Sequence, residues 1–342
     1  MLDLNPPRRD ATLRPTLLAG ALCLIVGALA ILPGCGGSAE TINPTVPRPL
    51  VLQPEAGMTY TFQSDVEQEI GLTVMGQEVD IFQNITLNIE WRVDSVLANG
   101  DFIGQATHTR FRLKQEGPGT FETFDTDDPD AEPQSDMSYG MAGMAGVPFK
   151  ARVTPTGEVT ILDGMDAFYN NMADLVGITD GVERDTFRTR ASGEFTAEDM
   201  AQDLIAAPFL YVARRVAPDS TWEVSTTADA MLPIRLTGTA RLDSATLDTT
   251  FVSLDAQVAS VQDTAGGLFP SGFQNADMSG TMTGTAGFDP QTGFALQVDF
   301  EQGMSGAAEM QTERQTLNVE LSVKTRSIVE GSVRTEAEEE ER

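Results

Sequence analysis

The stretch TYTFQSDVEQEIGLTVMGQEVDIFQNITLNIEWRV, residues 59–93, decides the fold. Apolar side chains occupy the even positions up to Val74 and the odd positions from Val79 onward. Because side chains alternate between the two faces of a strand, this period of two predicts a long antiparallel hairpin that turns near Gly76-Gln77. Each arm would reach about 50 Å at about 3.3 Å per residue. Strands of that length twist and curl, which favours a half-barrel or barrel.

The same alternation recurs on both sides of a helical middle segment. Asn99-Gly100 predicts the next tight turn, and further strands are predicted over 103–113, 149–153, 159–161, 234–242, 252–258, 282–288, 294–300 and 317–323. Apolar spacing predicts one helix from Asp166 onward, and Thr196 with Asp199 resembles a capping box that opens a second helix. We therefore expect a mainly β (α+β) fold, with long curved antiparallel strands in a half-barrel or barrel-like sheet of two halves and two short helices between them.

An apolar run over Leu17–Leu32 follows a short cationic start and ends at Leu32-Pro33-Gly34-Cys35. Charged, apolar and small residues in this order are typical of a secretory signal peptide. The last four residues resemble a bacterial lipobox, which implies cleavage between Gly34 and Cys35 and attachment of acyl chains such as palmitate to Cys35. An ordinary cleaved signal with an incidental cysteine is the alternative. Gly36 favours the outer membrane, so we expect a lipid-anchored protein of the bacterial cell envelope.

The predicted organisation begins with a signal peptide at 1–34, followed by a lipidated cysteine with a Pro-rich tether at 35–54. A β-rich domain follows at 55–330 and a disordered acidic tail at 331–342. We expect the domain to contain two similar halves, at about 55–162 and 218–330, joined by a helical segment at about 163–217. Gly280, Gly284 and Gly287 fall within one predicted strand, where glycines indicate bending or bulges.

The formal net charge is −29, and only three of the basic residues are lysines. No basic stripe is available to neutralise phosphates, which excludes nucleic acid as a partner. An acidic surface is also not attracted to anionic lipids, so contact with a membrane would depend on the N-terminal lipid anchor. The remaining candidate partners are an envelope protein or an apolar ligand.

The predicted domain has few residues suited to catalysis. His108 is its only histidine, and both cysteines precede the domain. His108 alternates with Arg110 and Arg112, opposite Phe111, which predicts a position on the solvent face. No phosphate-binding loop or dinucleotide fingerprint is present. We therefore expect neither an enzyme nor a cofactor; a hydrolase that uses unidentified carboxylates is the alternative.

One carboxylate cluster has residues that suit a hard cation, namely Asp125, Asp127, Asp128 and Asp130. An EF-hand loop requires Gly at its sixth position and Glu at its twelfth, where this chain has Asp130 and Asp136. A solvated acidic loop is therefore the favoured interpretation, and the metal site is the weaker alternative.

The inward face of the curved sheet carries aromatic residues that form a candidate ligand-binding set: Tyr60, Phe62, Trp91, Phe294 and Phe300. A cavity for an acyl chain or a similar apolar ligand would be lined by such side chains. A packed core is the favoured interpretation, because packed cores are commoner than hollow ones.

Several motifs together resemble a family of exported bacterial lipoproteins whose shared domain has no known function: Gly57-x-x-Tyr60-x-Phe62 with Gln68, Phe124-Asp125, Gly157-x-Val159 with Gly164, Pro218-Asp219-Ser220-Thr221-Trp222, and Gly287-x-Asp289 with Gly293. The resemblance covers nearly all of residues 53–327. It implies an extracytoplasmic β-rich domain and transfers no catalytic residue.

Together these features predict a membrane-anchored envelope lipoprotein without catalytic activity that acts as a structural or interaction module. The alternative is a carrier that binds an apolar ligand, such as a lipid, in a cavity of the curved sheet.

Overall fold

The structure, a computed structural model, describes residues 47–118, 120–229, 233–261, 273–311 and 316–335. The expected signal peptide, Cys35 and most of the expected tether lie outside the described residues, as do the last residues of the expected tail. Within the described ranges, no helix is both long and apolar enough to cross a membrane.

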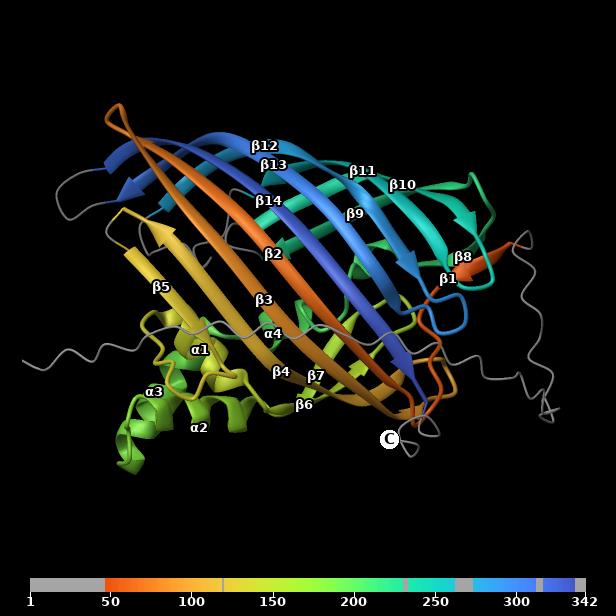
Figure 1. Ribbon diagram of the computed structural model, residues 1–342, viewed down its shortest axis with the longest axis horizontal. Coiled ribbons are helices and arrows are strands. Elements are labelled where there is room, and N and C mark those ends of the chain that lie inside the picture. The colour runs from red at the N-terminus through yellow and green to blue at the C-terminus, as the bar shows by residue number, and fades with distance from the viewer. Residues whose placement is uncertain (1–46, 119, 230–232, 262–272, 312–315, 336–342) are drawn as a thin grey trace, which may run out of the picture. The chain divides into compact units, whose positions relative to one another are not determined.

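Twelve antiparallel strands form one curved sheet (Figure 1). Their order is β7-β6-β4-β3-β2-β14-β13-β12-β11-β10-β9, with β5 beside β4, and the outermost strands β7 and β9 do not pair with each other in the described chain. The predicted mainly β fold with a curved half-barrel sheet is thus confirmed. The strands are β2 Thr59–Val74, β3 Gln77–Val96, β4 Phe102–Gly117, β5 Thr120–Asp125, β6 Pro148–Val153, β7 Val159–Asp163, β9 Thr221–Asp229, β10 Pro233–Ala245, β11 Thr250–Ser260, β12 Phe273–Phe288, β13 Ala295–Gln311 and β14 Thr316–Arg334.

The predicted long hairpin is formed by β2 and β3. The two strands pair without interruption until Val74 stands opposite Gln77. Met75 and Gly76 make the two-residue turn, with φ of 53° and 81°, as a type I′ hairpin requires. On its other side β2 pairs along its whole length with β14. This pairing joins the strands of the first half of the chain to those of the second half.

A β-bulge in β4 reverses which residues face the core. Asn88 pairs with Arg110 but Ile89 pairs with His108, so Thr109 is an extra residue in β4. Even-numbered residues of β4 face inward before the bulge, and odd-numbered residues face inward after it. His108 is consequently 2% exposed. The predicted position of His108 on the solvent face is wrong, because it was inferred from the alternation of residues 110–113, and the bulge reverses that alternation for the residues before it.

Glycines let the neighbouring strand lie very close to β12 in the second half of the sheet. A β-carbon on Gly280 would stand 1.8 Å from the carbonyl oxygen of Gly303 on the neighbouring strand. A β-carbon on Gly284 would stand 2.1 Å from the carbonyl oxygen of Asp299. No other residue type tolerates so close a backbone. The predicted irregularity is present at one of these glycines, where the pairing of β12 with β13 shifts register between Gly287 and Phe288.

The described chain has four α-helices and one 3₁₀ helix, at α1 Asp136–Met144, α2 Met165–Leu175, α3 Gly181–Glu194, α4 Ala197–Gln202 and η1 Pro208–Leu210. The two predicted helices correspond to α2 and α4, and the capping box of Thr196 with Asp199 is present. The expected number of two is wrong because α1 and α3 give weak sequence signals. Helix α1 is rich in glycine and methionine, and α3 exposes polar residues over most of its surface.

Helices α1, α2 and α3 pack against the inward side of the sheet, below β5 and to the left of β6 and β7 in Figure 1. Met141 of α1 belongs to the same apolar cluster as Phe111 and Leu113 of β4. Helix α2 packs through Phe168 against Phe149 of β6. Further along, the segment 204–211 fills one end of the concavity beneath β2 and β3.

The tether and the tail are both shorter than the sequence predicts. Arg48–Leu50 form β1, which pairs with β8 (Val212–Val216). Leu50 and Leu52 are 6% and 1% exposed. The predicted tether boundary at residue 54 is therefore too late. Residues between the prolines still have backbone N–H groups that can pair with β8, and Leu50 and Leu52 bury apolar surface. At the other end, residues 331–334 belong to β14 rather than to the tail.

We predict that Gly280→Ala lowers the free energy of unfolding by more than about 2 kcal/mol, since its methyl group would require the backbone of β13 to move. Gly303→Ala is the matched control, because its β-carbon would meet no atom within 4 Å. That variant should change the free energy by less than about 1 kcal/mol. Urea denaturation measures both, and equal losses in the two variants would contradict the close approach.

Candidate ligand-binding face of the sheet

The aromatic residues of the candidate ligand-binding set lie in a packed core at one end of the concave face. All five are buried, with exposures between 0% and 4%. The ring of Tyr60 stacks on that of Phe294, with centroids 4.2 Å apart, and on that of Phe62 at 5.4 Å. Tyr60 donates to the carbonyl of Ala295 at 2.7 Å, and burial raises the pKa of its hydroxyl. The structure thus brings these residues together and fills the space between them.

The segment 204–211 closes this end of the concavity from the inside. Trp91 donates its indole N–H to the carbonyl of Leu204 at 2.5 Å. Phe209 packs against Phe300, with ring centroids 5.8 Å apart. Tyr211 donates its hydroxyl to the carbonyl of Gly293 at 3.0 Å. Two buried donors and a buried ring thus find partners here, as expected of a packed core, although the indole N–H of Trp222 in the same cluster has no hydrogen-bond partner among the described residues.

Farther along the same strands, the inward face is only partly buried. On β2 this region lies between Phe62 and Ile70, which are 4% and 3% exposed. On β13 it lies between Phe300 and Met304, at 4% and 5%. We call this region the concave strip, which consists of Ser64, Val66 and Gln68 on β2, Ile85 and Leu87 on β3, Gln302 on β13, and Thr325 and Ser327 on β14.

The concave strip is amphipathic and carries no charge. Val66, Ile85 and Leu87 form its apolar part, and Val66 stands opposite both Ile85 and Ser327 in the sheet. Ile85 and Leu87 also contact the cluster that α1 forms with β4 and β5. None of the inward positions of β2, β3, β13 or β14 along the described strands holds a charged residue.

A row of polar side chains crosses the inward face at one level. Strand register places six of them side by side, and we call them the polar row: Glu122 on β5, Gln115 on β4, Gln83 on β3, Gln68 on β2, Thr325 on β14 and Gln302 on β13. Gln83 donates to Gln115 Oε1 at 3.2 Å, and Gln68 donates to Thr325 Oγ1 at 3.2 Å. Sequence reasoning missed this row. Its signal was present, since each glutamine occupies an apolar phase of an alternating strand.

The proposed metal-binding carboxylates are engaged by arginines and by turn amides. Arg110 donates two hydrogen bonds to Asp125, at 3.1 and 2.7 Å, and its guanidinium lies 3.1 Å from Asp127. These contacts hold the pKa of the Asp125 carboxyl below its ordinary value. Asp128 accepts a backbone hydrogen bond from Asp130. Among the described residues, no group of three or more His, Cys, Asp or Glu side chains is arranged to hold a metal ion.

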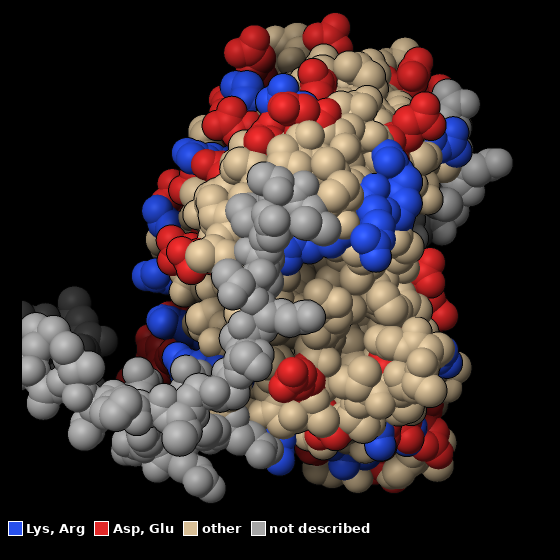
Figure 2. Space-filling model, turned by 90° about the vertical axis from the view of Figure 1, so that its right-hand side faces the viewer, with Lys and Arg blue, Asp and Glu red and all other residues tan. Residues whose placement is uncertain are grey.

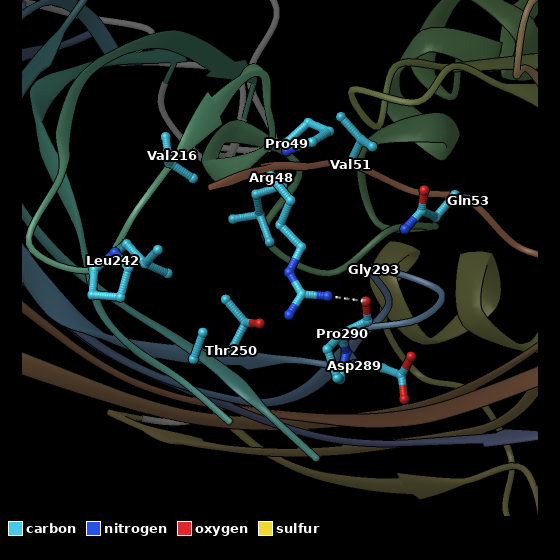
Figure 3. Close-up of a pocket in the computed structure, with 13 residues that line it drawn as sticks. Arg48, Pro49, Val51, Gln53, Val216, Leu242, Thr250, Asp289, Pro290 and Gly293 are labelled. Atoms are coloured by element: carbon cyan, nitrogen blue, oxygen red, sulfur yellow. Dashed lines mark hydrogen bonds between the residues drawn. The ribbon is translucent and has the colours of Figure 1, made fainter. Parts of the chain in front are cut away.

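A pocket of about 20 Å³ lies where β1 meets the turn between β12 and β13 (Figure 3). Arg48 points into it between Thr250 and Pro290, and donates to the carbonyl of Pro290 at 3.4 Å. Its Nη2 is buried without a hydrogen-bond partner in the described structure. The volume suits about one water molecule. Arg214 and Arg215 on β8 are exposed, and Figure 2 shows basic side chains grouped on this end of the domain.

An open groove of about 720 Å³ extends across the sheet from β12 to β4. Most of its lining residues alternate with the inward positions and so belong to the outer face, but Gln68, Gln83, Gln302 and Thr325 of the polar row line it as well. Its charged side chains pair with one another, as Lys114 does with Glu116 at 2.7 Å and Lys324 with Glu69 at 3.3 Å. Phe82 also lines the groove and is 49% exposed. The groove is therefore a mostly polar surface with one accessible aromatic ring, and Phe82 alternates with the inward residues Gln83 and Ile85 of the same strand.

A family model described as a family of unknown function, DUF6263, matches residues 99–295. The chain belongs to this family. The predicted resemblance to a family whose domain has no known function is confirmed, and the family description says nothing of lipidation. No curated protein matches the chain.

Solved structures show only weak likeness to this chain. Lipovitellin is 10% identical over 82% of this chain, with a TM-score of 0.40, and the match spans 26% of the lipovitellin chain. An outer membrane channel from Pseudomonas putida F1 is 8% identical, covering 82% of this chain and 97% of that one at a TM-score of 0.22. A DUF1329 family protein from Desulfovibrio piger ATCC 29098 is 8% identical, and the match covers 82% of this chain and 86% of that one with a TM-score of 0.17.

We predict that His108 makes stability depend on pH. Burial lowers the pKa of its imidazole from 6.5 to about 4, so the unfolded chain binds the proton first as the pH falls. Stability from this group is complete above about pH 6.5 and declines toward pH 4, by about 3 kcal/mol in total. Denaturant unfolding of wild type and His108→Leu across this range measures the difference. Parallel curves for the two proteins would contradict a buried neutral histidine.

Proposed function

We propose that this domain binds an amphipathic ligand, such as a lipid, on the concave strip and performs no catalysis. The observation that carries the proposal is the interruption of burial in the middle of the inward face. Residues at both ends of the strip are buried, whereas the strip itself is partly exposed. When a ligand covers inward apolar surface that was in contact with water, binding is favoured by about 25 cal/mol for each Å² removed from water.

The chemistry of the strip supports an amphipathic rather than a purely apolar ligand. Val66, Ile85 and Leu87 offer contact to hydrocarbon. Gln68, the next inward residue of β2 after Val66, and Thr325, which stands opposite Gln68 on β14, offer hydrogen bonds. Ligand sites of this kind combine a mostly apolar lining with a few polar groups that fix orientation.

We also propose that Cys35 is lipidated and holds the domain at a membrane of the bacterial envelope, by the lipobox-like Leu32-Pro33-Gly34-Cys35. A tether ending near residue 47 would connect the lipid to β1. Intact mass of the protein extracted from membranes tests this point, and a mature chain that lacks acyl mass would contradict it.

The second candidate is an interaction module that uses the outer groove. The observation in its favour is Phe82, an aromatic side chain 49% exposed among paired charges. Because Phe82 lies on the outer face, the two candidates are separable. Phe82→Ser should leave ligand binding on the concave strip unchanged.

We predict that the chain carrying Cys35→Ser binds the uncharged fluorophore N-phenyl-1-naphthylamine and retains lipid in native mass spectrometry. Val66→Phe should fill the strip, abolish fluorophore binding and leave the melting temperature nearly unchanged. Ala256→Leu, at a position 1% exposed in the packed core, should cost about 1–3 kcal/mol of stability by overpacking. If Val66→Phe is as destabilised as Ala256→Leu, and wild type binds no fluorophore, the strip is packed and the proposal is wrong.

A further inference from the structure

The polar row contains a buried acceptor that no protein group satisfies. Gln83 is 7% exposed, and its side-chain oxygen has no hydrogen-bond partner among the described residues. One N–H of its amide nitrogen donates to Gln115. A buried acceptor left unpaired costs about 1–3 kcal/mol. A ligand that supplied a hydrogen-bond donor at this position would remove that cost.

The neighbouring glutamine leaves this position open. Gln68 stands directly opposite Gln83 in the sheet but donates to Thr325 on its other side. The row therefore divides between β2 and β3, at the point where Gln68 and Ile85 of the concave strip are partly exposed. The terminal torsion of a glutamine is soft, so a small rotation brings the Gln83 oxygen to the strip.

The remaining members of the row indicate what the headgroup must offer. Gln302 donates to the weakly accepting sulfur of Met304 at 3.2 Å, so its N–H is available to a better acceptor. Thr325 brings a hydroxyl, which both donates and accepts. No lysine or arginine occupies an inward position of β2, β3, β13 or β14 in the described strands. An anionic headgroup would find no cation there, and its burial would be costly.

We propose that the polar row recognises an uncharged headgroup that both donates and accepts hydrogen bonds, with Gln83 Oε1 as the acceptor of a ligand hydroxyl or amide N–H. This inference rests on the proposed binding of an amphipathic ligand to the concave strip. It names the class of ligand as a hydroxylated or amide-bearing neutral lipid, as distinct from a fatty acid anion or an ester without a donor.

Displacement of N-phenyl-1-naphthylamine from the Cys35→Ser chain tests this inference with three probes of one acyl length. They are 1-monolauroylglycerol, methyl laurate and sodium laurate. We expect the monoglyceride to displace the fluorophore at about a tenfold lower concentration than methyl laurate, which corresponds to about 1.4 kcal/mol. Gln83→Leu should reduce this ratio to near one without lowering the melting temperature.

Gln63→Leu is the control, because Gln63 is exposed on the opposite face of β2; it should keep the tenfold ratio. If Gln83→Leu does not fold, Gln83→Met preserves the side-chain length without the acceptor. Equal displacement by monoglyceride and methyl laurate in wild type, or strongest displacement by laurate, would overturn the headgroup inference and leave the proposed function standing. Absence of fluorophore binding by wild type would overturn the proposed function itself.

Discussion

The pairing of β2 with β14 is the interaction on which the rest of the structure depends. It joins strands that lie at opposite ends of the described sequence, and so converts two groups of strands into one sheet. The register is unbroken from Val74 opposite Val319 to Thr59 opposite Arg334. A slip of one residue would turn every inward side chain of β14 outward. The polar row and the concave strip both exist because this register is held.

The two ends of the concave face differ in what covers them. At one end, residues 204–211 and the segment that contains Leu50 and Leu52 supply apolar side chains that no strand of the sheet provides. Their carbonyl groups also accept from buried donors such as Trp91. Over the strip, the α1 cluster contacts Ile85 and Leu87, but no segment of the described chain buries the strip completely, and its side chains stay partly exposed. The same sheet thus has a core at one end and an accessible surface farther along.

The sequence predicted the features that follow from alternation. The hairpin of β2 and β3, the curved sheet and the helices α2 and α4 all depend on local periodicity, turn residues and capping. It placed His108 wrongly because one extra residue, Thr109, reverses the alternation, and nothing local indicates such a bulge. The strands β1 and β8 were not predicted as a pair because their contact joins distant segments. The polar row was missed because its members align only once the order of β5, β4, β3, β2, β14 and β13 is known.

The central claim is that the concave strip is open to a ligand, and thiol accessibility tests it most directly. Both cysteines of the chain, Cys23 and Cys35, precede the domain, so a cysteine introduced in the domain of a chain that carries Cys23→Ser and Cys35→Ser reports on its own position. We expect Val66→Cys to react with a maleimide in the folded protein, 1-monolauroylglycerol to slow the reaction at least tenfold, and Ala256→Cys to be unreactive. A Val66→Cys thiol as protected as the one at Ala256, or one that the monoglyceride does not shield, would contradict an open ligand-binding strip.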